Sequence, residues 1–379
     1  MSEQSLIQLK ELIGNLPKSK ILAGASLRDG KYKFYLSGKK VGRIDAAISN
    51  KDAIIMGDGG VASIGFAKGN YSYSSHNFGF FSKNKNVETK YLYRALENFL
   101  PVIDYQGFKG SGIKNIDKNF LFDLYIQIPP LSEQKKITSI LTSVDELIEK
   151  TQLKIDKLQD LKKATMYEFF INHIAKTGLK DNRKSFLLSN LVSRIRTIEN
   201  NEVKNILTIS STRGWLDQSE RWSRKMAGES LKKYTKLKKG DFSYNRGNSK
   251  TFPYGCIFRM DKWDEAVVPN VYHSFEITNT QVDSNYLQQY FWSGALDKQL
   301  RKVLTSSARD DGLLNITADT FFSLNVDLPS LSEQKKVASI LTSMDKNIDD
   351  KKQKLTQIQF LKKSLMQDLL TGKVRVKVN

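Results

Sequence analysis

Two long stretches of the chain carry an apolar residue at alternating steps of four and three positions. Each begins just after a proline, Pro130 or Pro329, and continues for about 40 residues without glycine or proline. Steps that average 3.5 residues over about five heptads are typical of a coiled-coil helix. The predicted seam consists of Ile137, Leu141, Val144, Ile148, Ile155 and Leu158 in the first stretch, and of Val337, Leu341, Met344, Ile348, Leu355 and Ile358 in the second.

The two stretches are copies of one another. Residues 131–143 read LSEQKKITSILTS and residues 331–343 read LSEQKKVASILTS, which is an offset of 200 positions. The same offset relates Met166 to Met366 near the far ends of the stretches. Self-similarity at a fixed offset indicates an internal duplication, so we expect one unit present in two copies.

Upstream of these stretches the repeat is weaker and follows small changes of offset. The helical part of the unit has therefore kept its sequence, while the first part has diverged. The alignment pairs Asp52 with Asp241, Gly65 with Gly255, Asn77 with Asn270, and Tyr91-Leu92 with Tyr286-Leu287.

A single helix cannot bury a seam of this length, so each seam needs a partner. The two copies have matching registers on one polypeptide, which favours packing of the two helices against each other within the chain. A whole domain lies between the end of the first helix and the start of the second. An antiparallel pair would therefore place the two domains at opposite ends of a rod, with approximate two-fold symmetry. The alternative is that the helices pair between chains and form a homo-oligomer.

The segments before the helices have a different pattern. Their short apolar runs are broken by Gly, Asn, Asp and Ser, which is typical of short strands, tight turns and a few helices. The predicted fold class is α+β: two α+β domains separated by an antiparallel intramolecular coiled coil of two long helices, as a pseudo-two-fold tandem repeat. The expected boundaries are domain 1 at 1–130, a central helix at 131–175, a linker at 176–183, domain 2 at 184–330, and a C-terminal helix and tail at 331–379.

The chain is strongly basic, with 60 Lys and Arg residues against 40 Asp and Glu and a formal net charge of +20. This excess favours a polyanionic partner: nucleic acid, an anionic membrane surface or an acidic protein. No apolar run approaches the roughly 20 residues that span a bilayer, so we expect no membrane partner. The single cysteine, Cys256, excludes an internal disulfide and fits a reducing cytoplasm.

Loops of both domains are rich in residue types that bind DNA. Arg and Lys donate to guanine or to phosphate, Asn pairs with adenine, and Gly permits close backbone approach. For any single residue the alternative is an ordinary solvated side chain, but these types cluster at 244–250, next to a predicted strand end. The candidates are Lys68, Tyr71, Tyr73, His76, Asn77, Lys109, Ser111 and Lys114 in domain 1, and Arg213, Arg221, Arg224, Lys225, Tyr244, Asn245, Arg246, Asn248, Ser249, Lys250 and Arg309 in domain 2.

Motifs that carry catalysis are missing from the sequence. It has no phosphate-binding G-x-x-x-x-G-K-[ST] loop, no N-P-P-[YF] tetrapeptide of the amino-methyltransferases and no nuclease constellation of acids and lysine. The histidines His76, His173 and His273 lack the spacing of a metal site. The glycine-rich stretch 56–65 is interpreted as a turn between strands. We therefore expect no catalytic residue, no metal site and no cofactor in this chain.

A proline before LSEQKK at the start of a long helix, present twice, and TGKVRV at 371–376 after the second helix resemble the specificity (S) subunits of type I restriction-modification systems. The resemblance covers essentially the whole chain. It implies a non-catalytic protein that reads a bipartite DNA target, with one target-recognition domain per half-site and a coiled coil that sets the unread spacer. The two domains depart most from the family pattern, so individual base-contacting residues are not carried over.

The resemblance also implies a set of partners. These are double-stranded DNA, two methyltransferase (M) subunits docked on the helices, and restriction (R) subunits, with one copy of this chain per complex. The M subunits would bring S-adenosylmethionine for adenine methylation, and the R subunits ATP and magnesium. Two alternatives stay open: a freestanding (orphan) sequence-specific DNA-binding protein, and a coiled-coil scaffold without DNA affinity. A steep salt dependence of DNA affinity separates the scaffold from both DNA-binding interpretations.

Overall fold

The computed structural model describes residues 5–112, 114–172, 183–198, 205–221, 233–304 and 314–378. The chain folds into two compact units, one formed by Met1–Leu153 with Lys352–Asn379 and the other by Lys154–Lys351. Each unit combines one α+β domain with one segment of each long helix. The compact units therefore differ from the segments expected from the sequence, because both long helices contribute to both units.

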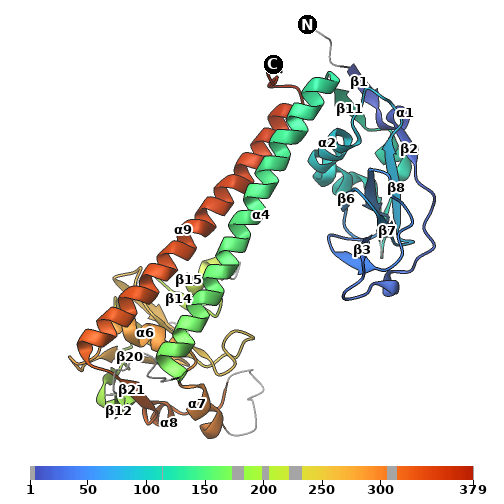
Figure 1. Cartoon of the computed structure of the whole chain (residues 1–379). Coiled ribbons are helices and arrows are strands. Elements are labelled where there is room, and N and C mark those ends of the chain that lie inside the picture. The colour runs from blue at the N-terminus through green and yellow to red at the C-terminus, as the bar shows by residue number, and fades with distance from the viewer. Residues whose placement is uncertain are drawn as a thin grey trace. The chain divides into compact units, whose positions relative to one another are not determined.

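The two long helices are α4 (Leu131–Tyr167), which continues as the π-helical turn η3 (Glu168–Asn172), and α9 (Leu331–Leu370). In each unit a segment of α4 packs antiparallel against a segment of α9 (Figure 1). In the first unit Lys362 Nζ lies 2.8 Å from Asp145 Oδ1, and in the second Lys162 Nζ lies 2.6 Å from Asp345 Oδ1. These ion pairs are related by the offset of 200, and the antiparallel coiled coil within one chain is confirmed.

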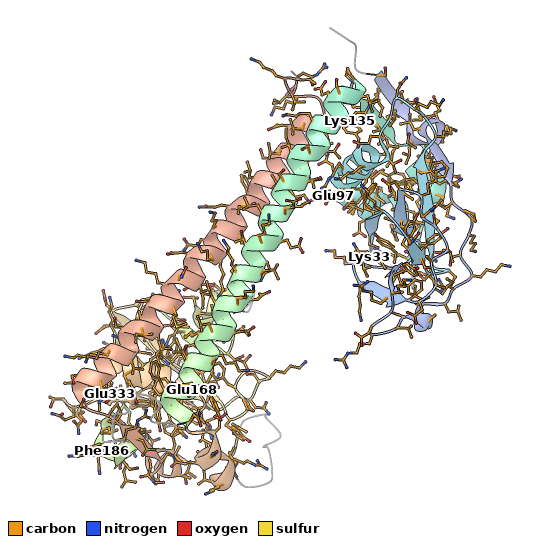
Figure 2. All side chains as sticks on the ribbon, in the orientation of Figure 1. Lys33, Glu97, Lys135, Glu168, Phe186 and Glu333 are labelled. Carbon is orange, nitrogen blue, oxygen red and sulfur yellow. The ribbon has the colours of Figure 1, made fainter. Side chains whose placement is uncertain are left out.

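Burial along the helices follows the heptad pattern. Every predicted seam position is buried or half-buried, and the Leu141 and Leu341 side chains are completely buried. Lys135 and Lys335, outside the seam, are exposed; Figure 2 labels Lys135 near the start of α4. The seam thus separates the packed side of each helix from its solvated side.

Domain 1 is built on the antiparallel sheet β2–β8–β5–β6. On one face of this sheet, Tyr91 of α2 covers Ile54 and Met56 of β5. On the other face, Ile55 of β5 packs against Tyr35 of the second sheet, β4–β3–β7. The element bounds are β1 Ser5–Gln8, α1 Leu9–Leu12, β2 Ile13–Asn15, η1 Ala23–Ala25, β3 Tyr32–Tyr35, β4 Val41–Ile44, β5 Ala53–Gly57, β6 Ile64–Ala67, β7 Tyr71–Tyr73, β8 Asn77–Ser82, α2 Thr89–Val102, η2 Ile103–Gly107, β9 Phe108–Lys109, β10 Asn115–Ile116, α3 Lys118–Phe122 and β11 Tyr125–Ile128.

Domain 2 is built on the sheet β13–β20–β17–β18. Phe242 of β17 and Tyr286 of α6 share one buried cluster, and a separate cluster around Leu207 and Leu237 forms between the shorter strand pairs β14–β15 and β16–β19. The element bounds are β12 Lys184–Leu187, η4 Leu188–Asn190, β13 Val192–Arg194, β14 Leu207–Ser210, β15 Gly214–Asp217, α5 Gln218–Arg221, β16 Thr235–Lys238, β17 Phe242–Asn245, β18 Cys256–Arg259, β19 Glu265–Val268, β20 His273–Ile277, α6 Ser284–Trp292, α7 Asp297–Val303, α8 Ala318–Phe322 and β21 Asn325–Leu328.

The two domains repeat one topology. The sheet β2–β8–β5–β6 recurs as β13–β20–β17–β18, and the pair β1–β11 recurs as β12–β21. The parallel contact between β3 and β7 recurs as a parallel bridge between Ile206 and Val267. Helices α3 and α8 begin at Lys118 and Ala318, again 200 positions apart. The duplication therefore extends through both domains.

Strand register corrects part of the sequence alignment of the two domains. Ile54 pairs with Phe80, and Phe242 pairs with Phe275, each on the helix-covered face of its sheet. Ile54 is thus the counterpart of Phe242, and the match of Asp52 to Asp241 is wrong by one position. A slip of one residue turns every side chain of a strand to the other face, so only the register shows which positions correspond.

The same comparison corrects a second match. Gly65 pairs with Ile55, and Ile64 with Met56, whereas Tyr244 pairs with Ile257. The counterpart of Gly65 is therefore Phe258, and its match to Gly255 is wrong.

In the described part of the chain, no helix is long and apolar enough to cross a membrane.

Candidate nucleic-acid interface

In domain 1 the loops that follow β3, β5 and β7 meet at one end of the two sheets. We define loop cluster 1 as residues 36–40, 58–63, 74–76, 109–112 and 114. Ser37 Oγ donates a hydrogen bond to the carbonyl of Gly59 at 3.2 Å, and the amide of Gly60 donates to the carbonyl of Lys114 at 2.8 Å. One surface therefore combines loops from distant parts of the sequence.

Four of the predicted DNA-binding residues lie exposed in loop cluster 1: His76, Ser111 and Lys114, and also Lys109, which is engaged in an ion pair. The amide of Asp58 donates to the carbonyl of His76 at 3.1 Å, and the imidazole Nδ1 lies 3.9 Å from the Asp58 carboxylate. The His76 side chain nevertheless remains 69% exposed. The side chains of His76, Ser111 and Lys114 are free to meet a ligand that approaches this end of domain 1.

Two glycines shape this surface. Gly38 and Gly60 have φ angles of +98° and +86°, in the left-handed region that side chains with a Cβ rarely adopt. No atom lies within 4 Å of the position that a Cβ would occupy at either residue. The backbone is therefore open to solvent at both points, as a close approach to DNA requires.

Two other predicted residues of domain 1 are placed differently. Lys109 is in the cluster, but its Nζ forms an ion pair of 2.8 Å with Asp117. Lys68 is exposed in the turn after β6, at the opposite end of the sheet, because the register pairs Ala67 with Ala53 at the start of β5. Lys68 therefore does not share a surface with the others.

The remaining candidates in domain 1 are core residues, and their prediction as DNA contacts is wrong. Tyr71 is completely buried and donates from its hydroxyl to the carbonyl of Lys51 at 2.7 Å. Tyr73 donates to the carbonyl of Pro17, and Asn77 Nδ2 donates to Ser74 Oγ at 2.7 Å. Side chains held in the interior by such bonds cannot reach a base edge.

Domain 2 carries a corresponding surface, loop cluster 2, which we define as residues 211–213, 246–255, 269–272 and 314–316. Asn245 Nδ2 donates to the carbonyl of Ile209 at 3.2 Å, which joins the end of β17 to the β14–β15 hairpin. The amide of Leu314 donates to the carbonyl of Arg246 at 3.0 Å. In both domains, therefore, the turn of a strand hairpin, the loop after the central strand β5 or β17, and the segment before the short helix α3 or α8 come together.

Within loop cluster 2 the exposed candidates are Arg213, Asn248 and Lys250, and Ser249 is half-buried. Asn245, at the end of β17 beside the cluster, is also half-buried. The candidates within the cluster belong to the hairpin turn after β14 and to the loop after β17. The hairpin turn and the loop after β17 are therefore the described parts of loop cluster 2 where candidate side chains reach solvent.

Two candidates of domain 2 are structural, and their prediction as DNA contacts is wrong. The Tyr244 ring is completely buried and stacks on Phe321 with centroids 4.5 Å apart. Arg246 is buried, and its Nε donates to the carbonyl of Val271 at 3.1 Å. Arg246 thus holds two loops of the cluster together.

The other candidates are not located by the structure. Arg224, Lys225 and Arg309 lie outside the described residues. Arg221 ends α5, and its side chain is also outside the described part. These four residues remain predictions.

Sequence reasoning missed the basic residues of the β3–β4 hairpin. Its tip, with Lys39 and Lys40, belongs to loop cluster 1, and both side chains are exposed. The available signal was local charge: residues 18–45 contain eight Lys and Arg against two Asp. A search by charge density would therefore have found this segment.

His273, behind loop cluster 2, gives the second unit a pH-dependent stability. Burial lowers its pKa to about 4, the charges of Arg246 and Arg194 act in the same direction, and the hydrogen bond with the Ile316 carbonyl opposes them. The unfolded chain therefore binds the proton more tightly. The contribution of about 3 kcal/mol is present above pH 6.5 and is lost as the pH falls toward 4.

We expect His273→Gln to remove this part of the pH dependence, because glutamine can still donate to the Ile316 carbonyl but does not titrate. Chemical denaturation of both proteins at pH 7 and pH 4.5, followed by hydrogen exchange in β17 and β20, measures it. Equal losses of stability in both proteins on acidification would contradict the assignment to His273.

No group of His, Cys, Asp and Glu within the described residues could hold a metal ion. Cys256 is buried, and burial raises the pKa of its thiol to about 12. The thiol is therefore not a nucleophile or a metal ligand at neutral pH.

The chain contains two copies of one α+β domain, and each copy is followed by one long helix of an antiparallel pair. Each copy also carries a cluster of polar loops at one end of its sheets. These features define a tandem-duplicated protein with two similar candidate interaction surfaces. Residues 3–160 and 192–359 both match the model of the type I restriction modification DNA specificity domain. The chain belongs to this family and carries the domain twice, as the LSEQKK repeat predicted.

Individual relatives agree with this placement. The chain is 28% identical over 400 residues to the type I restriction enzyme MjaVIII specificity subunit of Methanocaldococcus jannaschii, an alignment that covers 97% of this chain and 88% of the relative. It is 26% identical over 157 residues to the EcoDI specificity subunit of Escherichia coli, covering 41% of this chain and 34% of the relative. The crystal structure of the type I restriction-modification S subunit from M. genitalium shares the fold, with a TM-score of 0.65 at 16% identity over 97% of this chain and 96% of that one.

Proposed function

We propose that this chain is the DNA specificity subunit of a type I restriction-modification complex and that it reads a bipartite target with one loop cluster per half-site. The observation that carries the proposal is the match of both halves to the DNA specificity domain, combined with two loop clusters of the same architecture and different sequence. Equivalent surfaces with different side chains suit two half-sites with different bases.

The catalytic chemistry belongs to partner subunits in this proposal. Two M subunits would dock on the outer sides of the helices and supply S-adenosylmethionine, and R subunits would supply ATP and magnesium, with one copy of this chain per complex. The helices carry exposed apolar side chains that support docking, among them Leu147 at 44%, Leu161 at 55% and Phe360 at 75% exposure. A docked subunit would remove these side chains from water, which is favourable in proportion to the apolar area buried.

Methylation by the assembled complex tests the proposal. The chain is co-expressed with its M subunit, and the methylated adenines of the host DNA are mapped by sequencing. We expect one split sequence with a fixed spacer. Methylation without sequence preference, or sharp sequence-specific binding by this chain alone that the M subunit does not alter, would contradict the proposed role.

Variants in the loops should change one half-site at a time. We expect Asn248→Ala with Lys250→Ala to relax the half-site read by domain 2, and Ser111→Ala with Lys114→Ala to relax the other. Each lost base contact should reduce discrimination by about 1–3 kcal/mol, measured as the ratio of methylation rates on cognate and mismatched DNA. Lys85→Ala and Lys262→Ala, which remove exposed lysines at the opposite ends of the two sheets, are the matched controls. Relaxation of both half-sites by one pair would contradict the assignment of one domain per half-site.

A further inference from the structure

The β3–β4 hairpin of domain 1 and the segment leading into it form the most basic surface segment of the domain. Residues 18–45 hold eight basic and two acidic residues, and every one of the eight basic side chains is exposed. We name as the basic hairpin the residues Lys31, Lys33, Lys39, Lys40 and Arg43, which lie on β3, on β4, at their tip or next to them. Figure 2 labels Lys33 on this hairpin.

These charges are little used within the fold: Arg43 Nη1 donates to the carbonyl of Lys31 at 3.4 Å, a long bond that leaves the charge of the guanidinium uncompensated. Elsewhere in domain 1, Lys10 forms an ion pair with Asp123 at 2.8 Å and Lys109 forms one with Asp117 at 2.8 Å. Among the residues that the structure describes, no ion pair involves a side chain of the basic hairpin. Their positive charge is therefore available to a partner.

The strand register places two of these charges directly against each other. Lys33 on β3 is the cross-strand neighbour of Arg43 on β4, and both side chains are exposed. Like charges in directly opposite positions destabilise a strand pair. An anion bound between the two side chains would attract both of them and offset their mutual repulsion.

The spread of the charges identifies the kind of anion. At about 3.3 Å per residue, the three positions from Lys40 to Arg43 span about 10 Å, so the charges form a row instead of converging on one point. A DNA strand offers a phosphate for every 3.4 Å of helix rise. A row of unpaired cations therefore fits a polyanionic backbone and not a single small anion.

We propose that the basic hairpin binds the phosphate backbone of the same DNA whose bases loop cluster 1 reads. This inference rests on the proposed function. Its tip, residues 36–40, is part of loop cluster 1, and the amide of Gly38 donates to Ser63 Oγ at 3.1 Å within that cluster. Backbone contacts fix the register of a protein on a duplex, and base contacts select the sequence, so the hairpin positions domain 1 for reading.

Domain 2 does not repeat the basic strands of this hairpin, and the turn of its corresponding hairpin holds one basic residue, Arg213. The strands β14 and β15 read LTIS and GWLD and hold no Lys or Arg, and the cross-strand pair at the middle is Thr208 with Leu216. The basic hairpin is thus a property of domain 1 and not a requirement of the fold.

An alternative explanation is protection of an edge. β4 is the outer strand of the sheet β4–β3–β7, and charged residues on edge strands prevent association with other chains. Edge protection predicts aggregation of a neutralised variant with unchanged DNA affinity. Backbone binding predicts weaker DNA affinity with an unchanged target sequence.

The test compares Lys33→Gln/Arg43→Gln with Lys85→Gln/Lys262→Gln, which removes the same charge away from both loop clusters. Fluorescence anisotropy measures binding of the full complex with M subunits to cognate and unrelated duplexes. The salt concentration is varied from about 50 to about 250 mM, the range in which DNA affinity falls steeply with salt. We expect the slope of log K against log salt to become shallower by about 1.8 for two lost phosphate contacts. Affinity should fall on both duplexes alike, with the methylated sequence unchanged.

A slope equal to that of the control overturns the inference, and aggregation with an unchanged slope assigns the hairpin to edge protection. Lys39→Gln/Lys40→Gln at the exposed tip provides a second variant away from the paired strands, with the same expected result. If the unmodified complex shows no sequence preference, the proposed function fails. An unchanged slope in a complex that remains specific overturns only the role of the hairpin.

Discussion

Gln134→Leu is expected to lower the free energy of unfolding of the first unit by about 3–5 kcal/mol. Gln134 is completely buried at the start of α4. Its Nε2 donates to the carbonyls of Pro129 at 2.8 Å and Asn86 at 2.9 Å, and its Oε1 accepts from the amide of Glu88 at 2.9 Å. Leucine keeps the volume but leaves one buried and two partly buried backbone groups without this partner, at up to about 1–3 kcal/mol each before relaxation.

The same clamp holds the second unit. Gln334 Nε2 donates to the carbonyls of Pro329 at 3.0 Å and Gln281 at 2.9 Å, and its Oε1 accepts from the amide of Asp283 at 2.9 Å. Gln334→Leu should therefore destabilise the second unit by a similar amount. The clamp explains why LSEQ is repeated: one side chain must donate twice and accept once.

Hydrogen exchange during denaturant titration measures both variants, because it reports each unit separately when the chain does not unfold in one step. Gln159→Leu, at an exposed position of α4, is the matched control and should change stability little. Gln134→Glu keeps the acceptor but turns a buried carboxylate toward the two carbonyl oxygens, so at neutral pH we expect a loss at least as large as for leucine. A loss for Gln134→Leu no larger than for the control would show that the clamp is not a main source of stability.

Arg94→Gln is the second substitution with a large expected effect, about 3 kcal/mol. The Arg94 side chain on α2 is 5% exposed and lies 2.7 Å from Glu97 and 2.5 Å from Asp145 of α4. Lys362 of α9 lies 2.7 Å from Glu97 and 2.8 Å from Asp145. Two cations and two anions thus alternate between three helices. Burial lowers the pKa of Lys362, but hydrogen bonds to Asp145 and Glu97 outweigh it, so the net shift is upward.

Removing Arg94 alone leaves two partly buried carboxylates that share one lysine. The second unit shows how this is avoided: Gln289 replaces Arg94 and donates to Asp345 Oδ2 at 2.8 Å. Trp292 takes the position of Glu97, with Lys162 Nζ 5.3 Å from its ring centroid. One cation and one anion remain, and the charge is balanced.

The double variant Arg94→Gln/Glu97→Trp should therefore be more stable than Arg94→Gln alone. A double-mutant cycle by chemical denaturation measures this coupling, with Arg94→Gln and Glu97→Trp as the single variants. A loss equal to the sum of the two single losses would show that the charges act independently.

The long helices were predictable because their information is local. The heptad positions of Ile137 or Val337 are visible in a short window, and a periodic apolar stripe has few ways to be buried. The tandem duplication was visible for the same reason, as was the equivalence of Tyr91 with Tyr286. The match of Asp52 with Asp241 failed because the sequence does not show which face a strand residue occupies.

The candidate site was less predictable, because a polar or aromatic residue in a loop-like sequence can either be hydrogen-bonded in the interior or reach solvent and bind a ligand. Tyr71, Asn77 and Tyr244 have the chemistry of DNA readers, but they are bonded in the interior. Lys33 and Arg43 were missed, although both are exposed on a hairpin and neither forms an ion pair with a described residue. Exposure decides between the uses, and it depends on residues far away in the chain.

The sequence by itself determined the duplicated unit, the two long helices with their seam, and the absence of catalytic motifs, since each rests on spacing along the chain. The tertiary structure alone decided which loops meet, which candidates reach solvent, and how Gln134 and Arg94 join each domain to the helices. Those features are contacts between segments up to 265 positions apart, such as Glu97 and Lys362, and no local pattern encodes a distance in space.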